Sequence, residues 1–269
     1  MSVELILIAL SPIFLLFMVA EYFKYRHFYE VKDSLSNMAL GASYQVSDTL
    51  ILFLLMPAFI WLHQFSLFEI PFTGWTLLIG FIIQDFLYYW FHRASHFIHW
   101  FWVAHVAHHS STKLNFSTAF RQSVMYPIMG MWLFWLPMIL VGFEPAMVFA
   151  IVALNLAFQF FIHTQAVGKL GWIEKVFNTP SHHRVHHSTN REYIDKNFAG
   201  ILIIWDKMFG TFIEEKDDVP CKFGIVGELP GNNPIKANVD QGLHMLRKLK
   251  QAKGWQQKRA VLFGYPTHE

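Results

Sequence analysis

Long apolar stretches constrain the fold of this chain more than any other feature. A helix needs roughly 17–25 mainly apolar residues to cross the hydrocarbon core of a bilayer. Candidate stretches run over residues 3–23, 38–62, 75–91, 124–141 and 146–162. Only 15% of the residues are charged, whereas an ordinary globular chain has about 25%. The sequence therefore predicts an all-α fold, a polytopic membrane helical bundle of about four to five transmembrane spans.

Basic residues between these stretches predict how the bundle lies in the membrane. Lys and Arg follow the first, third and fifth stretches, and none occurs in the two connections between them, residues 63–74 and 142–145. Cytoplasmic connections are enriched in Lys and Arg. We therefore expect a multi-pass integral membrane protein with the N-terminus outside and the C-terminus in the cytosol. The first stretch lacks a basic leader and a small-residue cleavage site, so we expect it to be a retained span.

Composition divides the chain into three regions. Residues 1–74 are expected to hold the N-terminal spans, residues 75–215 a catalytic domain rich in histidine, and residues 216–269 a cytosolic loop and a charged amphipathic helix over about 235–251. The formal net charge is only +2, and basic residues cluster mainly between Arg247 and Lys253. A solvated helix face or contact with anionic lipid headgroups explains that cluster better than nucleic-acid binding.

Histidines are concentrated in two short windows. Ten of the 15 fall within residues 92–109 and 182–187, and eight of these form three boxes with helical spacing. The boxes are His92 and His96; His105, His108 and His109; and His183, His186 and His187. Residues three and four apart share a helix face, and neutral imidazole is the commonest metal ligand. The boxes therefore predict a helical metal site, placed by the topology at the cytosolic end of the bundle.

The number of candidate ligands predicts two metal ions. A closed zinc site takes four ligands, so eight histidines are too many for one ion. The single cysteine, Cys221, excludes a thiolate cluster. Imidazole-rich sites suit Fe, Zn, Cu or Ni, and the lack of soft ligands argues against Cu(I). The ligand set alone leaves the identity of the metal open.

Polar side chains run in stripes along two of the predicted spans. The stripes are Asp85, Tyr88, Tyr89, His92 and His96 in the third span and Asn155, Gln159 and His163 in the fifth. Polar groups in membrane helices normally face the bundle interior or a wet cavity. We therefore expect both stripes to point toward the histidine region. For Gln45 and Asp48, inside the second span, interhelical hydrogen bonding is as good an explanation as function.

The boxes also resemble those of a known protein family. The segments His92–His96, His105–His109 and His183–His187 resemble the boxes of the fatty acid hydroxylase and sterol desaturase superfamily. Further stretches are similar to its alkylglycerol monooxygenase branch, at residues 115–123, 178–187, 195–197 and 203–212. The resemblance implies a membrane-bound non-haem di-iron enzyme that uses O2 to hydroxylate or desaturate a lipid. It also implies a lipid substrate from the bilayer and an electron donor in the cytosol or the membrane.

The branch adds expectations of its own. Alkylglycerol monooxygenases use a reduced pterin and cleave ether lipids by hydroxylating the carbon next to the ether oxygen. In the animal enzymes an acidic residue is expected directly after the first box, where this chain has Phe97. That difference leaves the pterin dependence and the ether-lipid substrate open.

Roles for individual residues follow from the resemblance. The expected metal ligands are the eight box histidines, with His163 as a ninth. Ligating histidines usually donate their second N–H to an acceptor. The candidates for that role are Asp85, Asn155, Gln159 and Asp195. Asn115 and Arg121 are candidates for orienting a cytosolic cofactor or a lipid headgroup, with a structural role equally open. His99 and His182 lie beside the boxes and are expected to be outer or exposed histidines.

Two other functional classes stay open at this point. A zinc-dependent membrane hydrolase would need neither O2 nor a reductant. A non-catalytic metal-binding membrane protein would arise from a family member that had lost a ligand. No gap is visible in the three boxes, which argues against the second class.

Overall fold

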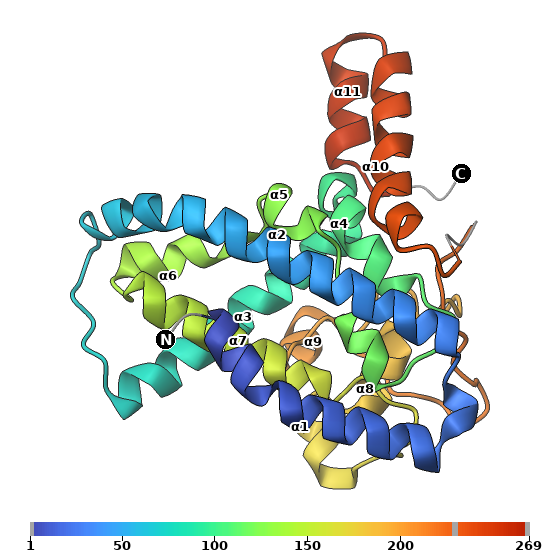
Figure 1. Ribbon diagram of the computed structural model, residues 1–269. Coiled ribbons are helices and arrows are strands. Elements are labelled where there is room, and N and C mark those ends of the chain that lie inside the picture. The colour runs from blue at the N-terminus through green and yellow to red at the C-terminus, as the bar shows by residue number, and fades with distance from the viewer. Residues whose placement is uncertain (1–2, 228–230, 267–269) are drawn as a thin grey trace.

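Helices make up the described structure, which confirms the all-α prediction. The computed structural model describes residues 3–227 and 231–266 (Figure 1). The α-helices are α1 (Val3–Lys24), α2 (Val31–His63), α3 (Gly74–Phe97), α4 (His99–His109), α5 (Met125–Ile128), α6 (Leu136–Val141), α7 (Pro145–Phe160), α8 (Pro180–His186), α9 (Ile204–Phe209), α10 (Pro234–Gln251) and α11 (Gly254–Phe263). Four 3-10 turns join them: η1 (Arg26–Phe28), η2 (Phe116–Phe120), η3 (Met131–Trp135) and η4 (Gly171–Lys175). In the part described, extended pairing is limited to two isolated bridges.

The first three apolar stretches form the single helices α1, α2 and α3. Among the described residues, α2 is long and apolar enough to cross a membrane by itself, and a second candidate results if one bent pair of helices is counted as one span. Large apolar side chains along α2, such as Phe53 and Leu54, are exposed, and such a surface indicates a lipid or protein contact. Membrane association is therefore supported, and the number of four to five spans stays a prediction.

The fourth apolar stretch is bent, so the prediction of a continuous helix over residues 124–141 is wrong. The segments Phe116–Ile128 and Met131–Val141 meet at 90°. Gly130 lies between them with φ of +79°, a left-handed conformation that glycine adopts without a side-chain clash. α7 then begins at Pro145, the last residue of the connection expected at residues 142–145, where a proline suits the first turn of a helix.

α7 lies at the centre of the bundle and contacts α1, α2 and α3. Figure 1 shows α1 and α2 crossing the front in opposite directions. One buried apolar cluster joins Phe59 of α2, Tyr88 of α3 and Ile151 of α7. Gly41 allows α2 to approach the η2 turn closely, because a Cβ at this position would lie 2.8 Å from the carbonyl oxygen of Phe120. This packing holds α2 against the segment that follows the second box.

The C-terminal region forms a helical hairpin of α10 and α11. α10 covers the predicted amphipathic helix, and the Asn233 side chain caps its start by accepting from the backbone N–H groups of Ile235 and Lys236 at 3.0 and 3.1 Å. Figure 1 shows the pair projecting away from the body beside α4. At the end of the hairpin, the carbonyl oxygen of Gly264 accepts from the backbone N–H of His99 at 2.9 Å. The hairpin is thereby tied to the helix that carries the second box.

Candidate metal centre

Nine histidines lie together inside the bundle in two groups. The five-histidine group consists of His92, His96, His105, His109 and His186, and the four-histidine group of His108, His163, His183 and His187. Within each group the candidate ligand nitrogens all lie within 4.8 Å of one another. Every ring is buried. Five and four nitrogen ligands are numbers that suit two separate transition-metal ions.

Four segments bring these rings together. α3 supplies the first box from its last two turns, α4 the second, the short turn after α7 supplies His163, and α8 with its C-cap supplies the third box. Ile98, with φ of −116° and ψ of 116°, ends α3 and lets α4 turn back toward it. The second box divides between the centres, because His105 and His109 join one group while His108 joins the other. The third box also divides, because His186 joins the five-histidine group while His183 and His187 join the four-histidine group.

Hydrogen bonds determine which ring nitrogens face each centre. The Nδ1 atoms of His92, His108, His163 and His186 donate to backbone carbonyl oxygens at 2.6–3.1 Å. Because the carbonyl requires the proton on Nδ1, each Nε2 keeps a free lone pair. The Nε2 atoms of His163 and His183 face each other at 2.9 Å, and Nε2 of His186 has no hydrogen-bond partner. Buried nitrogen atoms that converge in this way suit a cation, so the residues fit bound metal.

Burial keeps the histidines of the second and third boxes neutral. The pKa values of these six side chains lie well below their usual range, first because burial penalises the charged form and then because neighbouring imidazoles repel a second charge. A neutral imidazole is the form that binds metal. The environment therefore prepares the rings as ligands near neutral pH.

Side chains contact two rings of the five-histidine group from outside. Nδ1 of His96 donates to Oδ1 of Asp195 at 3.2 Å, and Oδ2 of Asp195 accepts from the Tyr265 hydroxyl at 2.6 Å. Asp195 thus lies where a carboxylate orienting a ligand would be needed. Nδ1 of His105 contacts the hydroxyl of Tyr126. No sequence signal points to Tyr126, because it lies outside the boxes in a segment interpreted as part of a span.

The other three residues were expected to accept hydrogen bonds from histidine rings, and their side chains do not do so. Asp85 accepts from the backbone N–H groups of Ile201 and Leu202 and from the Trp205 indole at 2.9–3.0 Å. Asn155 donates to Asp85 at 3.0 Å, and Gln159 donates to Asn155 at 2.5 Å. These side chains hold the loop before α9, whose buried N–H groups need acceptors. Only the backbone carbonyl of Gln159 reaches a histidine, at His163.

Asn115 and Arg121 make structural contacts, which favour the structural role that the sequence left open beside the cofactor-orienting one. The Asn115 side chain caps η2 and donates to the carbonyl oxygen of Phe28 at 2.9 Å. The Arg121 guanidinium is fully buried and donates to the carbonyl oxygen of Ala107 and to the Asn37 side chain at 2.9 and 2.8 Å. A guanidinium inside a protein needs such acceptors, and these leave it no free face for a ligand.

His99 and His182 lie outside both groups. Nδ1 of His99 donates to the carbonyl oxygen of Val261 at 2.9 Å, and its Nε2 accepts from Gln241 at 2.9 Å. The ring of His182 packs edge-on against Phe212. His99 therefore attaches the C-terminal hairpin, and both residues are buried rather than exposed.

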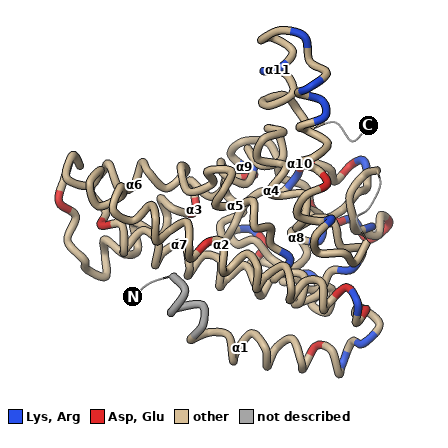
Figure 2. Tube along the Cα trace, turned by 45° about the horizontal axis from the view of Figure 1, so that its top comes forward, with Lys and Arg blue, Asp and Glu red and all other residues tan. Residues whose placement is uncertain are grey.

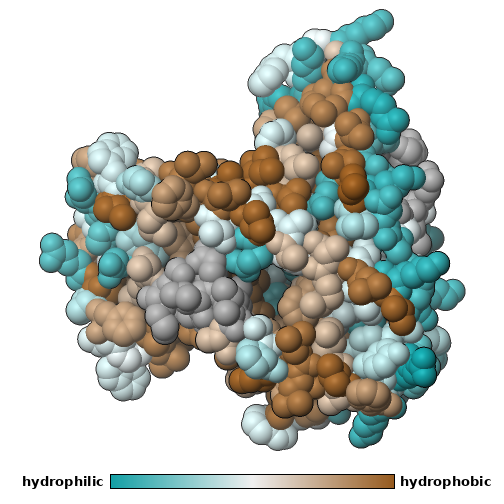
Figure 3. All heavy atoms as spheres, in the orientation of Figure 1, coloured by the Kyte–Doolittle hydropathy of each residue, from teal (hydrophilic) through white to brown (hydrophobic). Residues whose placement is uncertain are grey.

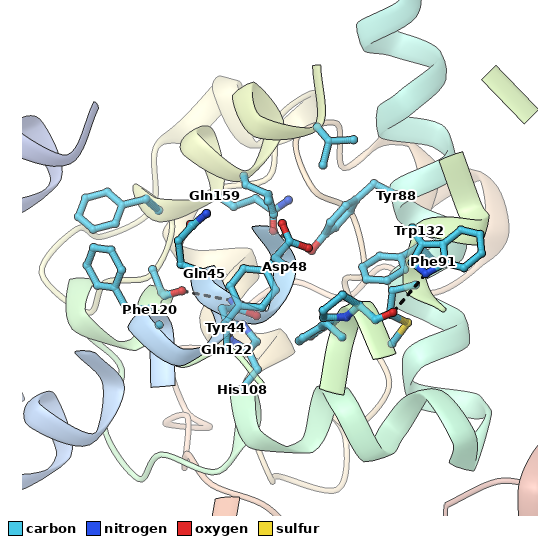
Figure 4. Close-up of a pocket in the computed structure, with 18 of the residues that line it drawn as sticks. Tyr44, Gln45, Asp48, Tyr88, Phe91, His108, Phe120, Gln122, Trp132 and Gln159 are labelled. Atoms are coloured by element: carbon cyan, nitrogen blue, oxygen red, sulfur yellow. Dashed lines mark hydrogen bonds between the residues drawn. The ribbon is translucent and has the colours of Figure 1, made fainter. Parts of the chain in front are cut away.

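A cavity of about 350 Å³ reaches both histidine groups. His105, His108 and His163 contribute to its wall, and most of the rest is apolar, with Leu52 of α2 and Phe149 and Leu156 of α7. Figure 4 shows Gln45 and Asp48 projecting from α2 between Phe120 on one side and Tyr88 on the other. Figure 3 shows the apolar front of the molecule hollowed near its centre. The cavity suits an apolar chain with a small polar portion.

Residues 77–211 match the family described as Fatty acid hydroxylase, and they include all three boxes and His163. The chain belongs to the fatty acid hydroxylase family. A metal-dependent oxidoreductase acting on a lipid in a membrane setting is the class that this membership supports.

Named relatives agree with this membership. The chain is 38% identical to human alkylglycerol monooxygenase over 237 residues, which cover 87% of this chain and 52% of that protein. It is 42% identical to the Danio rerio alkylglycerol monooxygenase over 193 residues, covering 71% and 43%. It is 28% identical to an ornithine lipid hydroxylase of Rhizobium tropici over 157 residues, covering 58% and 47%. The chain spans about half the length of the curated relatives it matches. No solved structure matches it.

Proposed function

We propose that this protein is a membrane-bound non-haem di-iron oxygenase that uses O2 to hydroxylate a C–H bond of a lipid. The observation that carries the proposal is the position of the two histidine groups at the wall of one apolar cavity. An apolar cavity excludes water and holds an alkyl chain, while its histidine wall marks the place where oxidation occurs. Desaturation at the same site would require the same components.

The nine histidines are the proposed ligands. The five-histidine group would hold one iron and the four-histidine group the other, and bound iron supplies the activation of O2 and the oxidation of the C–H bond. The backbone carbonyls fix four of the rings, and the Asp195 carboxylate orients His96. The cavity positions the chain beside His105, His108 and His163. Electrons would come from a cytosolic or membrane donor.

We also propose an ether lipid such as an alkylglycerol as the substrate. Support comes from the names of two relatives and from the cavity, which combines apolar walls with the polar pair Gln45 and Asp48. A reduced pterin is a candidate reductant because the alkylglycerol monooxygenase branch uses one. Phe97, after the first box, packs against Phe198 and Tyr265, so an acidic group is not available at that position.

The proposed topology places several helices in the membrane. α1, α2, α3, α7 and the bent pair would form the four to five spans, with the N-terminus outside and the boxes on the cytosolic side. Figure 2 supports this arrangement, since Lys and Arg gather around α8, the end of α1 and the C-terminal hairpin. The three proposed regions are the N-terminal spans over residues 1–74, the catalytic domain over residues 75–215, and the cytosolic loop and amphipathic helix over residues 216–269.

The test is product analysis with isotope-labelled oxygen. The iron-loaded full chain in lipid would be given an alkylglycerol, a reductant and 18O2, with and without reduced pterin. The proposal predicts 18O in the cleavage products and no product under nitrogen. Product formation that continues without O2, with the new oxygen taken from water, would establish a hydrolase instead. The variant His105→Ala serves as the inactive control.

A further inference from the structure

The C-terminal hairpin of α10 and α11 is the most basic part of the chain. Residues 234–263 carry seven of its 21 Lys and Arg residues and one acidic residue, Asp240. The basic residues are Lys236, Arg247, Lys248, Lys250, Lys253, Lys258 and Arg259. Figure 2 shows several of them along the projecting arm. The proposed reaction at the histidine groups uses none of these residues.

The same hairpin exposes large apolar side chains. Ile235, Leu243 and Leu246 of α10 are 71%, 52% and 50% exposed, and Trp255 of α11 is 68% exposed. The three α10 residues occupy one side of the helix, because at 100° per residue they fall within an arc of about 80°. On the opposite side of α10, Ala237 and Met245 are buried. α10 therefore has an apolar stripe that nothing in the described structure covers.

Basic residues lie along one edge of this stripe and within it. At 100° per residue, Lys236 and Arg247 follow Leu243 at the edge, and Lys250 lies between Leu246 and Leu243. An apolar stripe bordered by Lys and Arg is typical of helices that lie in the interface of an anionic membrane.

The base of the hairpin lies at the level where the predicted spans begin. Ala237 packs with Leu40 of α2, two residues into the second apolar stretch. The Asn238 side chain accepts from the backbone N–H of Val124, the first residue of the fourth stretch, at 3.0 Å. Figure 1 shows the hairpin running across the direction of α2 rather than along it. With α2 crossing the bilayer, the hairpin would lie along its cytosolic surface.

The apolar surfaces of the hairpin and of the bundle are continuous. In Figure 3 the apolar side chains on the hairpin continue the apolar surface over α2, while hydrophilic side chains gather on the opposite edge of the hairpin. The same orientation that places α2 in lipid therefore turns the apolar side of the hairpin toward the bilayer. We propose that α10 and α11 form an in-plane membrane arm that binds an anionic lipid surface.

The test compares two positions on α10 in the full-length protein. In a Cys221→Ser background, nitroxides would be attached at Leu246→Cys, on the stripe, and at Gln251→Cys, on the polar side. The protein would be placed in vesicles of phosphatidylcholine mixed with phosphatidylglycerol or of phosphatidylcholine alone. Collisions with O2, which dissolves in lipid, and with a water-soluble nickel chelate report the surroundings of each nitroxide. Leu243→Cys is the replacement if Leu246→Cys does not fold.

In the anionic vesicles the nitroxide at residue 246 should collide more with O2, and that at residue 251 more with nickel. Replacing Arg247, Lys250 and Lys253 by Gln should shift residue 246 toward nickel, as should neutral vesicles or high salt. Retained metal content shows that this variant is folded. Equal nickel accessibility at the two positions in anionic vesicles would overturn the proposal, because the arm would then lie in water. Protection of residue 246 from both reagents would overturn it too, since a protein partner or a second copy would cover the stripe.

Discussion

The two histidine groups differ in how their rings are held from outside. In the five-histidine group, the side chains of Asp195 and Tyr126 contact Nδ1 of His96 and His105. In the four-histidine group, backbone carbonyls hold His108 and His163, and Nδ1 of His183 has no partner. A substitution can therefore alter the outer contacts of the first group while leaving its ligands in place. In the second group the comparable side-chain contact is the Gln122 amide, 3.3 Å from Nδ1 of His108, and it shares that nitrogen with a backbone carbonyl.

Removal of a ligand histidine should lower activity and metal affinity more than any other change. The loss should be similar in the two histidine groups. His163→Ala and His105→Ala should each lower activity and metal affinity by at least the 10–100-fold typical of outer-contact losses. Metal analysis and turnover of the purified variants would measure this. His63→Ala is the control, because this residue lies outside both groups and should change little. Two metals and near-normal turnover in His163→Ala would remove His163 from the ligand set.

Loss of the Asp195 carboxylate should affect the five-histidine group alone. Asp195→Asn keeps the shape of the side chain but weakens the charge-assisted bond to His96, and about 10–100-fold lower metal affinity or activity is expected. Metal titration should show one weakened site and one normal site. Asp85→Asn is the matched control, because that carboxylate holds a loop and its loss should lower thermal stability instead. Equal weakening of both metal sites by Asp195→Asn would contradict the distinction.

Tyr126→Phe tests the second outer contact with a smaller change. The variant removes the hydroxyl beside His105 and keeps the ring that lines the cavity. Loss of one hydrogen bond to a buried ring corresponds to about 0.5–1.5 kcal/mol, or roughly tenfold at most. The expected result is lower kcat with KM nearly unchanged, because the lipid contacts remain. A rise in KM alone would indicate that Tyr126 binds substrate rather than positions the ring.

Tyr265→Phe should have the smallest effect of the four. It removes the hydroxyl that donates to Asp195 but leaves the bond from His96 to Asp195 intact. We expect the metal content to be unchanged and the activity to fall only a few-fold, consistent with one neutral donor. A loss as large as that of Asp195→Asn would show that the C-terminal segment, rather than the carboxylate, determines the position of His96.

The sequence predicted the first three long helices and the cluster of nine histidines, because helical spacing is a local property. It did not predict how the second box divides, since His105, His108 and His109 share one helix face and only the packing of α7 and α8 separates them. The expectation that Asp85 contacts a histidine ring was wrong for a related reason. Periodicity shows that a polar residue faces inward, but it does not name the partner, which here is a loop 116 residues away along the chain.

Two further features depend on tertiary contacts that no local pattern reveals. The bend at Gly130 follows from one left-handed residue inside an otherwise apolar stretch. Tyr126 contacts His105 only because that stretch turns back over α4. The boxes, in contrast, carry their geometry in their own spacing.

Metal content combined with iron depletion tests the central claim most directly. The full chain expressed with ample iron should contain close to two iron ions, as the five and four ligands require. Lipid oxidation should disappear when the iron is removed and return when it is restored, in step with O2 consumption. A single tightly bound zinc, with activity that persists after iron depletion, would contradict the account.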